Sequence, residues 1–176
     1  MNTDSQKPAA QLGRAFIWIA WLLALGLLTL FFNGVLDRQR NPNQSLHSQV
    51  DAHGVREVVL QRNRAGHYLA TGSINGQRVE FLLDTGASDV SIPAALAQRL
   101  GLQAGAPRVY QTANGLITAH ATRLAELRIG EIVLYDVRAS INPAVDDIGI
   151  LLGMSALKQL EFTQRGNTLI LRQHPL

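Results

Sequence analysis

The sequence predicts one mainly β domain of about 120 residues, preceded by a single transmembrane helix. Three observations support this fold class: a long uncharged run, a polar segment without hydrophobic period, and then short apolar runs bounded by Gly, Asn and Pro. The predicted organisation is an N-terminal tail over 1–14, a transmembrane helix over 15–36, a flexible linker over 37–54 and the β domain over 55–176.

The composition excludes several classes of protein. The chain has 176 residues and no cysteine, so it is not a disulfide scaffold, a zinc ribbon or a cysteine-nucleophile enzyme. Hydrophobic residues make up 47%, which excludes a largely disordered chain. The net charge of +3 is small and no basic stripe is present, so we expect no nucleic-acid partner.

The uncharged run extends from Ala15 to Leu36. Its 22 residues would rise about 33 Å as a helix, enough to cross a hydrocarbon core of about 30 Å. Trp18 and Trp21 near one end, and Phe31 near the other, are typical interfacial anchors. A cleaved signal peptide is the alternative, but its apolar region is shorter and ends in small residues. We therefore expect an uncleaved anchor.

The charges that flank the anchor say little about its orientation in the membrane. Lys7 and Arg14 precede it, whereas Arg38 and Arg40 follow it, so the positive-inside count is equal. The amino terminus adds one cation to a tail too short to be a domain, which favours a cytoplasmic N-terminus. The polar residues 37–54 would act as a tether with a span of about 23 Å.

Short β-like runs follow from Val55. The predicted strands are Val58–Leu60, His67–Ile74 and Arg78–Leu83, and Asn75-Gly76 between the last two predicts a type I′ hairpin. Later elements are a hairpin of Thr122–Ile129 and Ile132–Ile141 about Gly130-Glu131, a short helix over Met154–Leu160 and a last strand over Thr168–Arg172.

One helix is predicted after the third strand. Ser91 is the expected N-cap, and Pro93 falls in the first turn. Leu96 and Leu100 share one face, which we expect to pack in the core, and Gly101 ends the helix.

The most informative stretch is the apolar run Phe81–Leu83 followed by Asp84-Thr85-Gly86-Ala87-Ser88. An acid at the end of a buried strand needs a reason, since burying an unpaired carboxylate is expensive. Asp and Gly also suit turns, so the tripeptide alone is weak evidence. Two further segments accompany it: Thr112–Ile117, a hairpin tip with Asn-Gly, and the apolar run Ile150-Leu151-Leu152 that ends in Gly153-Met154.

This combination resembles the retropepsin-like aspartic proteases of clan AA, especially their bacterial single-pass membrane branch. The resemblance covers Arg56 to Leu171 and includes Asn75-Gly76 before the motif and residues 97–102 after it. It implies a retropepsin-like acid protease fold, a closed β-barrel-like half with a flap hairpin and one or two short helices. It also implies a location in the inner membrane, with the protease domain in the periplasm.

The resemblance implies an aspartic endopeptidase that cleaves protein or peptide substrates. Two carboxylates about 3 Å apart share one proton, so the pair acts as base toward water and as acid toward the peptide bond. The chain has one Asp-Thr-Gly, so a homodimer with one Asp84 per subunit is implied. The nearest second candidate, Asp146-Asp147-Ile148-Gly149, has a polar loop context that argues against it.

The family roles transfer to neighbouring positions. Thr85 would bond backbone across the dimer, and Gly86 would let backbone approach the carboxylates. Ala87 lacks a hydroxyl that would favour the ionised dyad, so a working range less acidic than that of pepsin-like enzymes is expected. The flap and subsite residues would be Thr112, Ala113, Asn114, Gly115, Leu116 and Ala87, and the support of the catalytic loop would be Leu151, Leu152 and Gly153.

The remaining residues that could carry chemistry do not indicate another kind of active site. The five histidines show no metal-ligand spacing, and no metal or organic cofactor is implied. Ser88 and Ser155 lack the Gly-x-Ser-x-Gly context of a nucleophile. Thr168–Leu171 is a candidate dimer strand, and substrates would bind by strand addition with hydrophobic side-chain preference. The alternative function is a catalytically silent retropepsin-like module for binding or dimerisation.

Overall fold

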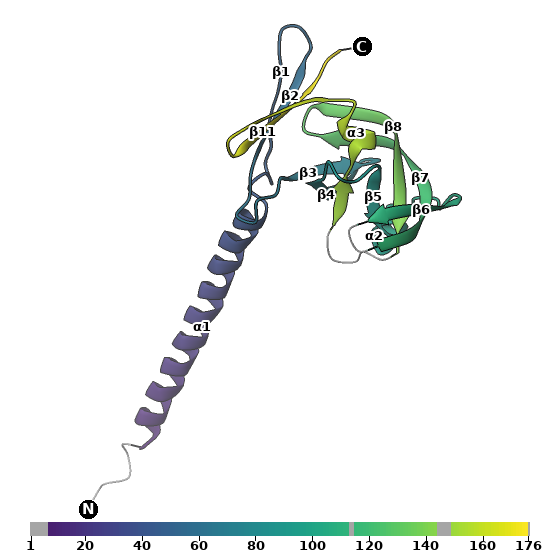
Figure 1. Ribbon diagram of the computed structural model, residues 1–176. Coiled ribbons are helices and arrows are strands. Elements are labelled where there is room, and N and C mark those ends of the chain that lie inside the picture. Colours follow the sequence, from purple (N-terminus) through teal and green to yellow (C-terminus); the bar gives the residue numbers. More distant parts are fainter. Residues whose placement is uncertain (1–6, 113–114, 144–148, 176) are drawn as a thin grey trace, which may run out of the picture. The chain divides into compact units, whose positions relative to one another are not determined.

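The computed structural model describes residues 7–112, 115–143 and 149–175 (Figure 1). It divides into two units, Met1–Arg38 and Gln39–Leu176, which are treated separately below. Helix α1 spans Lys7–Arg40. Its part Phe16–Arg40 is long and apolar enough to cross a membrane, a property that a signal sequence near the N-terminus would share.

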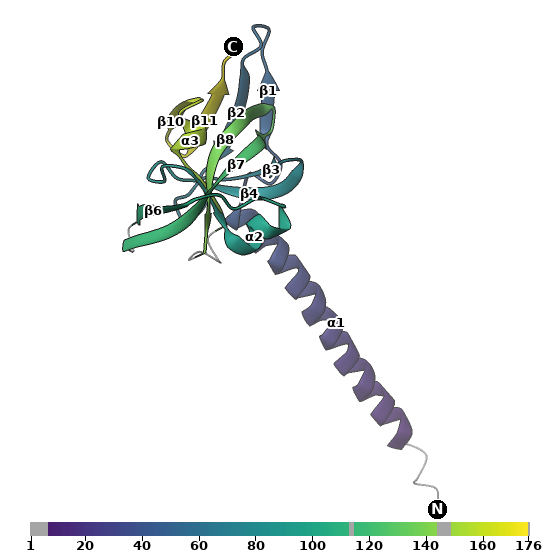
Figure 2. The same ribbon diagram turned by 90° about the vertical axis from the view of Figure 1, so that its right-hand side faces the viewer.

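The second unit is built on two sheets. The smaller sheet has the strand order β1-β2-β11-β10, all neighbours antiparallel, and Figure 2 shows these strands side by side. Its strands are β1 His47–Val50, β2 Arg56–Gln61, β11 Thr168–Gln173 and β10 Glu161–Arg165.

The larger sheet closes on itself. Its order is β3-β4-β9-β5-β8-β7-β6, and β3 also pairs with β7 through Ser73↔Arg128 and Ile74↔Leu127. Strand β6 therefore lies outside the ring and forms a hairpin with β7. The strands are β3 Leu69–Ile74, β4 Gln77–Leu83, β9 Ile150–Leu152, β5 Val90–Pro93, β8 Ile132–Asn142, β7 Gly115–Ile129 and β6 Pro107–Thr112.

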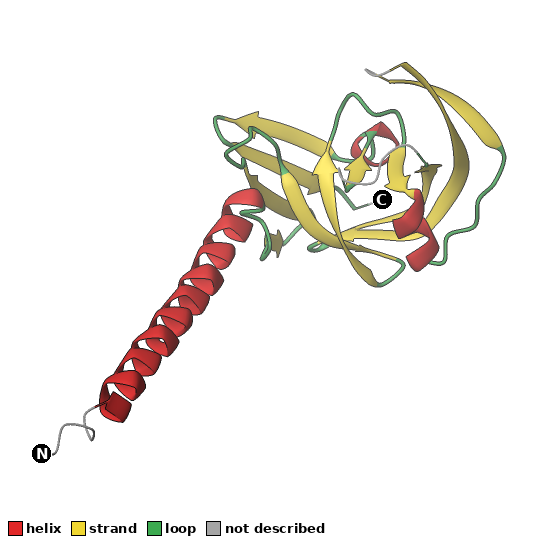
Figure 3. Ribbon diagram, turned by 90° about the horizontal axis from the view of Figure 1, so that it is seen from below, coloured by secondary structure: helices red, strands yellow, loops and turns green. Residues whose placement is uncertain are grey.

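Two short helices complete the unit, α2 over Ala94–Arg99 and α3 over Met154–Leu157 (Figure 3). The predicted fold class is confirmed: the chain is mainly β, with a barrel-like ring, a projecting hairpin, two short helices and one apolar N-terminal helix. The core fills the ring, where the inward-facing side chains of its strands are buried, as the alternation along a strand predicts. Fully buried members include Phe81, Ile92, Leu124, Ile150 and Leu152.

Both predicted hairpins are present. Asn75 and Gly76 have φ of 50° and 78°, as a type I′ turn requires, and Ile74 pairs with Gln77 across it. The second hairpin joins β7 to β8 with Ile129 opposite Ile132.

The predicted start of the first helix is wrong. Ser91 lies in β5, and the N-cap of α2 is Pro93. Pairing of β5 with β8 and complete burial of Val90 and Ile92 outweigh a single side-chain cap. The end is as expected, because Gly101 adopts φ of 66° just after the helix. Helix α3 is shorter than the predicted Met154–Leu160.

The segment expected to be a flexible linker, 37–54, is largely ordered. Helix α1 continues to Arg40, and β1 pairs with β2. Asn43 is buried, where its amide nitrogen donates to Gln61 O at 2.9 Å and Leu69 O at 2.7 Å, and its Oδ1 accepts from Gln61 N at 2.7 Å. Side-chain bonds to backbone, which hydrophobic periodicity does not reveal, therefore fix this segment to the domain.

The expectation that Thr168–Leu171 offers a dimer strand is also wrong. These residues lie in β11, and both edges of β11 are paired within the chain, with β2 on one side and β10 on the other. A strand without a free edge cannot add a further strand. In the part of the chain that the structure describes, the outer strands of this sheet are β1 and β10.

Candidate active site

The position of Asp84 follows from the alternation along β4. Val79 and Phe81 point into the core, so residues in the opposite phase, which include Asp84, face away from it. Strand β4 runs parallel to β9 with Leu83 opposite Leu152, and the Asp84 N–H donates to Leu152 O at 3.2 Å. The acid therefore leaves the end of a buried strand as a half-buried side chain.

A tight turn orients the carboxylate. The Gly86 N–H donates to Asp84 Oδ1 at 2.8 Å, and the Ala87 N–H donates to Asp84 O at 3.3 Å. A β-carbon at position 86 would lie 3.1 Å from Asp84 Oδ1, so any side chain there would press on the carboxylate. Glycine at this position allows the close approach of backbone to acid that the sequence predicted.

The segment after β9 holds the other side of this loop. Met154 N–H donates to Ala87 O at 2.8 Å, and Ser155 N–H donates to Ser88 O at 2.9 Å. A β-carbon at Gly153 would lie 2.2 Å from Asp89 O, so glycine is sterically required. The structure thus places Leu151–Gly153, expected as support of the catalytic loop, directly beside it.

Ser155 contributes a contact that the sequence did not predict. Its hydroxyl donates to Arg138 O at 2.7 Å in β8 and accepts from Val90 N–H at 3.0 Å at the start of β5. The residue is only 3% exposed. It is a structural hydroxyl that joins α3 to two strands next to the Asp84 loop.

A cavity of about 380 Å³ lies in front of Asp84. The β6–β7 hairpin contributes Tyr110, Gln111, Thr112 and Ile117 to its lining, and the catalytic loop contributes Asp84, Gly86 and Ala87 with Ser88 and Asp89. The predicted flap hairpin and the acid therefore share one cavity.

The predicted flap residues differ in their positions. Thr112 lines the cavity, pairs with Gly115 and donates from Oγ1 to Gly115 O at 2.8 Å. Leu116 is 70% exposed and does not line it. Ala113 and Asn114, the expected tip, lie outside the described residues, as do Asp146, Asp147 and Ile148 of the second acidic candidate.

Thr85 faces a different hollow. The residue is exposed, and together with Leu83, Phe162 and Leu171 it lines a cavity of about 320 Å³ that Asp84 also borders.

A second acid, Asp89, lines the catalytic cavity but is already engaged. Tyr110 OH donates to Asp89 Oδ2 at 3.0 Å, and Arg138 Nη2 lies 3.5 Å from Oδ1. The Asp89 side chain is only 10% exposed. Burial raises the pKa of Tyr110 above its ordinary value, and the hydrogen bond to Asp89 and its negative charge raise it further. The phenol is therefore a persistent donor to Asp89.

Sequence reasoning missed the Asp89–Tyr110–Arg138 cluster. The only local signal was an acid directly before the apolar run Val90–Pro93. Among the described residues, no three His, Cys, Asp or Glu side chains form a group that could hold a metal ion.

Comparison with known proteins identifies the family. The family model of the gag-polyprotein putative aspartyl proteases matches residues 70–159. An uncharacterized protein of the cobV 5′ region of Sinorhizobium sp is 35% identical over 117 residues, which cover 65% of this chain and 50% of the relative. An uncharacterized protein of Rickettsia prowazekii (strain Madrid E) is 32% identical over 110 residues, 61% of this chain and 47% of the relative. The chain thus spans about half the length of these curated relatives.

A solved structure supports the same assignment. The crystal structure of a retropepsin-like aspartic protease from Rickettsia conorii is 29% identical to this chain, with a TM-score of 0.59. The match covers 73% of this chain and 96% of that one. The chain therefore belongs to the gag-polyprotein putative aspartyl protease family and has the retropepsin-like aspartic protease fold.

Proposed function

We propose that the protein is a membrane-anchored, homodimeric aspartic endopeptidase in which each subunit contributes one Asp84. One observation carries the proposal: Asp84, oriented by the Gly86 N–H, lies in the same cavity as the β6–β7 hairpin. The family and fold support an aspartic protease, and among the described residues the other acid that lines this cavity, Asp89, is already bound by Tyr110 and faced by Arg138.

Peptide hydrolysis would use the two Asp84 carboxylates together. A pair about 3 Å apart keeps one proton, so one carboxylate takes a proton from water while the other donates to the carbonyl oxygen of the peptide. The carboxyl group that took the water proton then gives it to the amide nitrogen, the C–N bond breaks, and the other carboxylate takes a proton back from the tetrahedral carbon's hydroxyl, so the pair again holds one proton. Gly86 N–H would hold each carboxylate in place, and the β6–β7 hairpin would cover the extended substrate.

The second copy would meet this chain beside Thr85. Thr85 is exposed, and the neighbouring hollow is bordered by Phe162, an apolar side chain that is 42% exposed and that a partner would cover. Attachment of α1 to the membrane would raise the effective concentration of subunits, so a weak interface would suffice. We propose a cytoplasmic N-terminus and a periplasmic protease domain in the inner membrane.

Mixed subunits test the dimeric mechanism. The full chain in detergent micelles is assayed for cleavage of casein and of a peptide library. It is assayed alone and after mixing with the Asp84→Asn chain, with time for subunits to exchange between micelles. If two Asp84 side chains form the site, an equal mixture of wild-type and Asp84→Asn subunits has about one quarter of the activity of the same total amount of wild type, because only wild-type pairs are active. Independent monomers would leave about one half.

Controls separate this outcome from folding effects. Asp51→Asn removes a carboxylate in the β1–β2 turn. Asp51 Oδ1 accepts hydrogen bonds from the His53 and Val55 N–H groups, and the amide oxygen of Asn can accept the same bonds. The activity of this variant should match that of wild type. Cleavage that survives in the pure Asp84→Asn protein would refute the mechanism. Absence of cleavage in all proteins, despite a dimer, would support the silent binding module instead.

A further inference from the structure

A second cavity lies next to the catalytic one. Its volume is about 510 Å³, and both cavities are lined by Asp89 and Tyr110. The second cavity is enclosed by the loop after α2 and by strands β6, β7 and β8. The two cavities are therefore adjacent, and the hydrogen-bonded side chains of Tyr110 and Asp89 border both.

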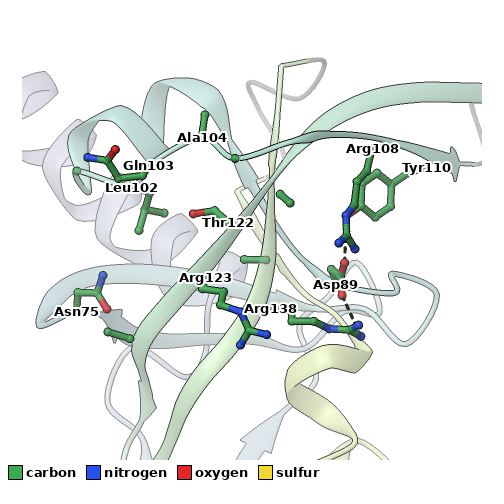
Figure 4. A pocket seen from close by; sticks show the side chains of 15 residues that line it. Asn75, Asp89, Leu102, Gln103, Ala104, Arg108, Tyr110, Thr122, Arg123 and Arg138 are labelled. Atoms are coloured by element: carbon green, nitrogen blue, oxygen red, sulfur yellow. Dashed lines mark hydrogen bonds and ion pairs between the residues drawn. The ribbon is translucent and has the colours of Figure 1, made fainter.

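Three arginines from three strands line this second cavity, Arg108 from β6, Arg123 from β7 and Arg138 from β8 (Figure 4). Asp89 is the one carboxylate among its lining residues. Arg138 lies against Asp89, as the dashed line in Figure 4 marks, and Arg123 pairs with Asp136, whose side chain is largely exposed. The lining thus has an excess of positive charge.

Arg108 is the cation available to a ligand. Its side chain is exposed, and it forms no ion pair with any residue that the structure describes. Figure 4 shows it beside Tyr110, both extending from β6 toward Asp89. Asp89 is already bound by the Tyr110 hydroxyl and faced by Arg138, so it does not neutralise all the charge around it.

The geometry of β6 relates this arginine to the catalytic cavity. Alternate residues of a strand share a face, so Arg108, Tyr110 and Thr112 lie on one side of β6. Thr112 lines only the catalytic cavity, Tyr110 lines both, and Arg108 lines only the second. At about 3.3 Å per residue, Arg108 is about 13 Å along the strand from Thr112.

We propose that the arginine-lined cavity is a specificity site for an acidic side chain of the substrate. This inference depends on the proposed peptidase function. A peptide extended along β6 has the same rise per residue as the strand. The peptide residue beside Arg108 would therefore lie about four residues from the peptide residue beside Thr112, and the acidic side chain would be at that position. The Arg108 guanidinium would bind that carboxylate through paired N–H donors, with Arg138 and Arg123 adding to the positive potential. The substrate class is thus a protein with a hydrophobic cleavage site and an acid several residues away.

A peptide series tests the site in the full chain. Peptides with a common hydrophobic centre carry a single Glu or Gln at successive flanking positions, and kcat/KM is measured for wild type, Arg108→Gln and the control Arg64→Gln. Arg64 is exposed and lies in the β2–β3 loop. We expect wild type and Arg64→Gln to prefer the Glu peptide about tenfold at one position, and Arg108→Gln to cleave the Glu and Gln peptides with equal kcat/KM.

Binding to inactive protein separates this proposal from the function itself. The same labelled peptides are titrated against Asp84→Asn and against Asp84→Asn combined with Arg108→Gln, at low and high salt. The site is supported if the Glu peptide binds more tightly than the Gln peptide, and if both the Arg108→Gln substitution and high salt abolish this difference. This result would support the site even if wild type cleaves no peptide and the peptidase proposal fails. Equal binding and equal cleavage of the Glu and Gln peptides would overturn it.

Discussion

Removal of the Ser155 hydroxyl should destabilise the domain more than any other loss of one oxygen near the site. Ser155→Ala deletes the acceptor for Val90 N–H, which is buried, and the donor to Arg138 O, which is partly buried. Water cannot replace the acceptor for Val90 N–H without opening the contact between α3 and β5. Two backbone groups thus lose their hydrogen bonds through one substitution that creates almost no cavity.

The expected magnitude follows from those two groups. Each unsatisfied buried group costs about 1–3 kcal/mol, and the removed hydroxyl no longer has to be desolvated, so we expect a net loss of about 2–4 kcal/mol. For a domain of this size the loss corresponds to a fall in Tm of roughly 10 °C. Because Val90 follows the Asp84 loop, the local effect should reach the active site.

Pulse proteolysis in urea measures the stability of the domain in the full chain. Tryptophan fluorescence would not serve, because Trp18 and Trp21 both lie in α1. Ser88→Ala is the matched control, since Ser88 is exposed and should change stability by less than about 0.5 kcal/mol. Hydrogen exchange should show a faster Val90 amide in Ser155→Ala only. If the two variants unfold at the same urea concentration and the Val90 amide is unchanged, the proposed role of Ser155 is wrong.

Three further changes test other contacts. Gly153→Ala would place a β-carbon 2.2 Å from Asp89 O, so it should destabilise by about 3 kcal/mol in the same assay, whereas Gly86→Ala, with its nearest atom at 3.1 Å, should stay folded but cleave slowly. Asn43→Ala leaves three backbone groups of β2 and β3 without their hydrogen-bond partner and should lower the free energy of unfolding by about 2–4 kcal/mol. A stability equal to that of wild type would show that residues 41–46 are a linker after all. Glu161 has a lowered pKa, chiefly because His174 hydrogen-bonds to it. The stability that this carboxylate contributes to the folded domain is therefore present above the ordinary carboxyl pKa and is lost as pH falls through the lowered value. Carbon-detected NMR of His174→Ala should show that pKa moved up toward the ordinary one, and an unchanged titration would contradict the assignment.

The features that the sequence predicted correctly are local along the chain. The Asn75-Gly76 turn depends on two adjacent residues, and the apolar run before Asp84 reports one buried strand. The parallel pairing of β4 with β9 is not local, but the run Ile150–Leu152 before Gly153 was recognisable through the resemblance to a known family.

The features that it missed depend on polar side chains brought together over long separations. Asn43 lies in the segment predicted to be a linker and Ser155 in the predicted short helix, yet the side chains of both are buried and bind backbone groups distant in sequence. Hydrophobic periodicity carries no information about such contacts, because their partners are N–H and C=O groups that every residue has. The same limit explains why Ser91 was mistaken for a helix cap, since only the pairing of β5 with β8 shows that it belongs to a strand.

The two acids of the catalytic cavity serve different ends. Asp84 has one oxygen bound by a backbone N–H of its own turn and faces the cavity. Asp89 has one oxygen bound by Tyr110, and its other oxygen lies 3.5 Å from Arg138, so its carboxylate is held by two neighbouring strands. It instead connects the hairpin strand β6 to β8 and holds Arg138 at the arginine-lined cavity. Chemistry at Asp84 and substrate preference near Asp89 would therefore respond to different substitutions, and under the proposed mechanism the second carboxylate of the dyad would come from another copy of the chain.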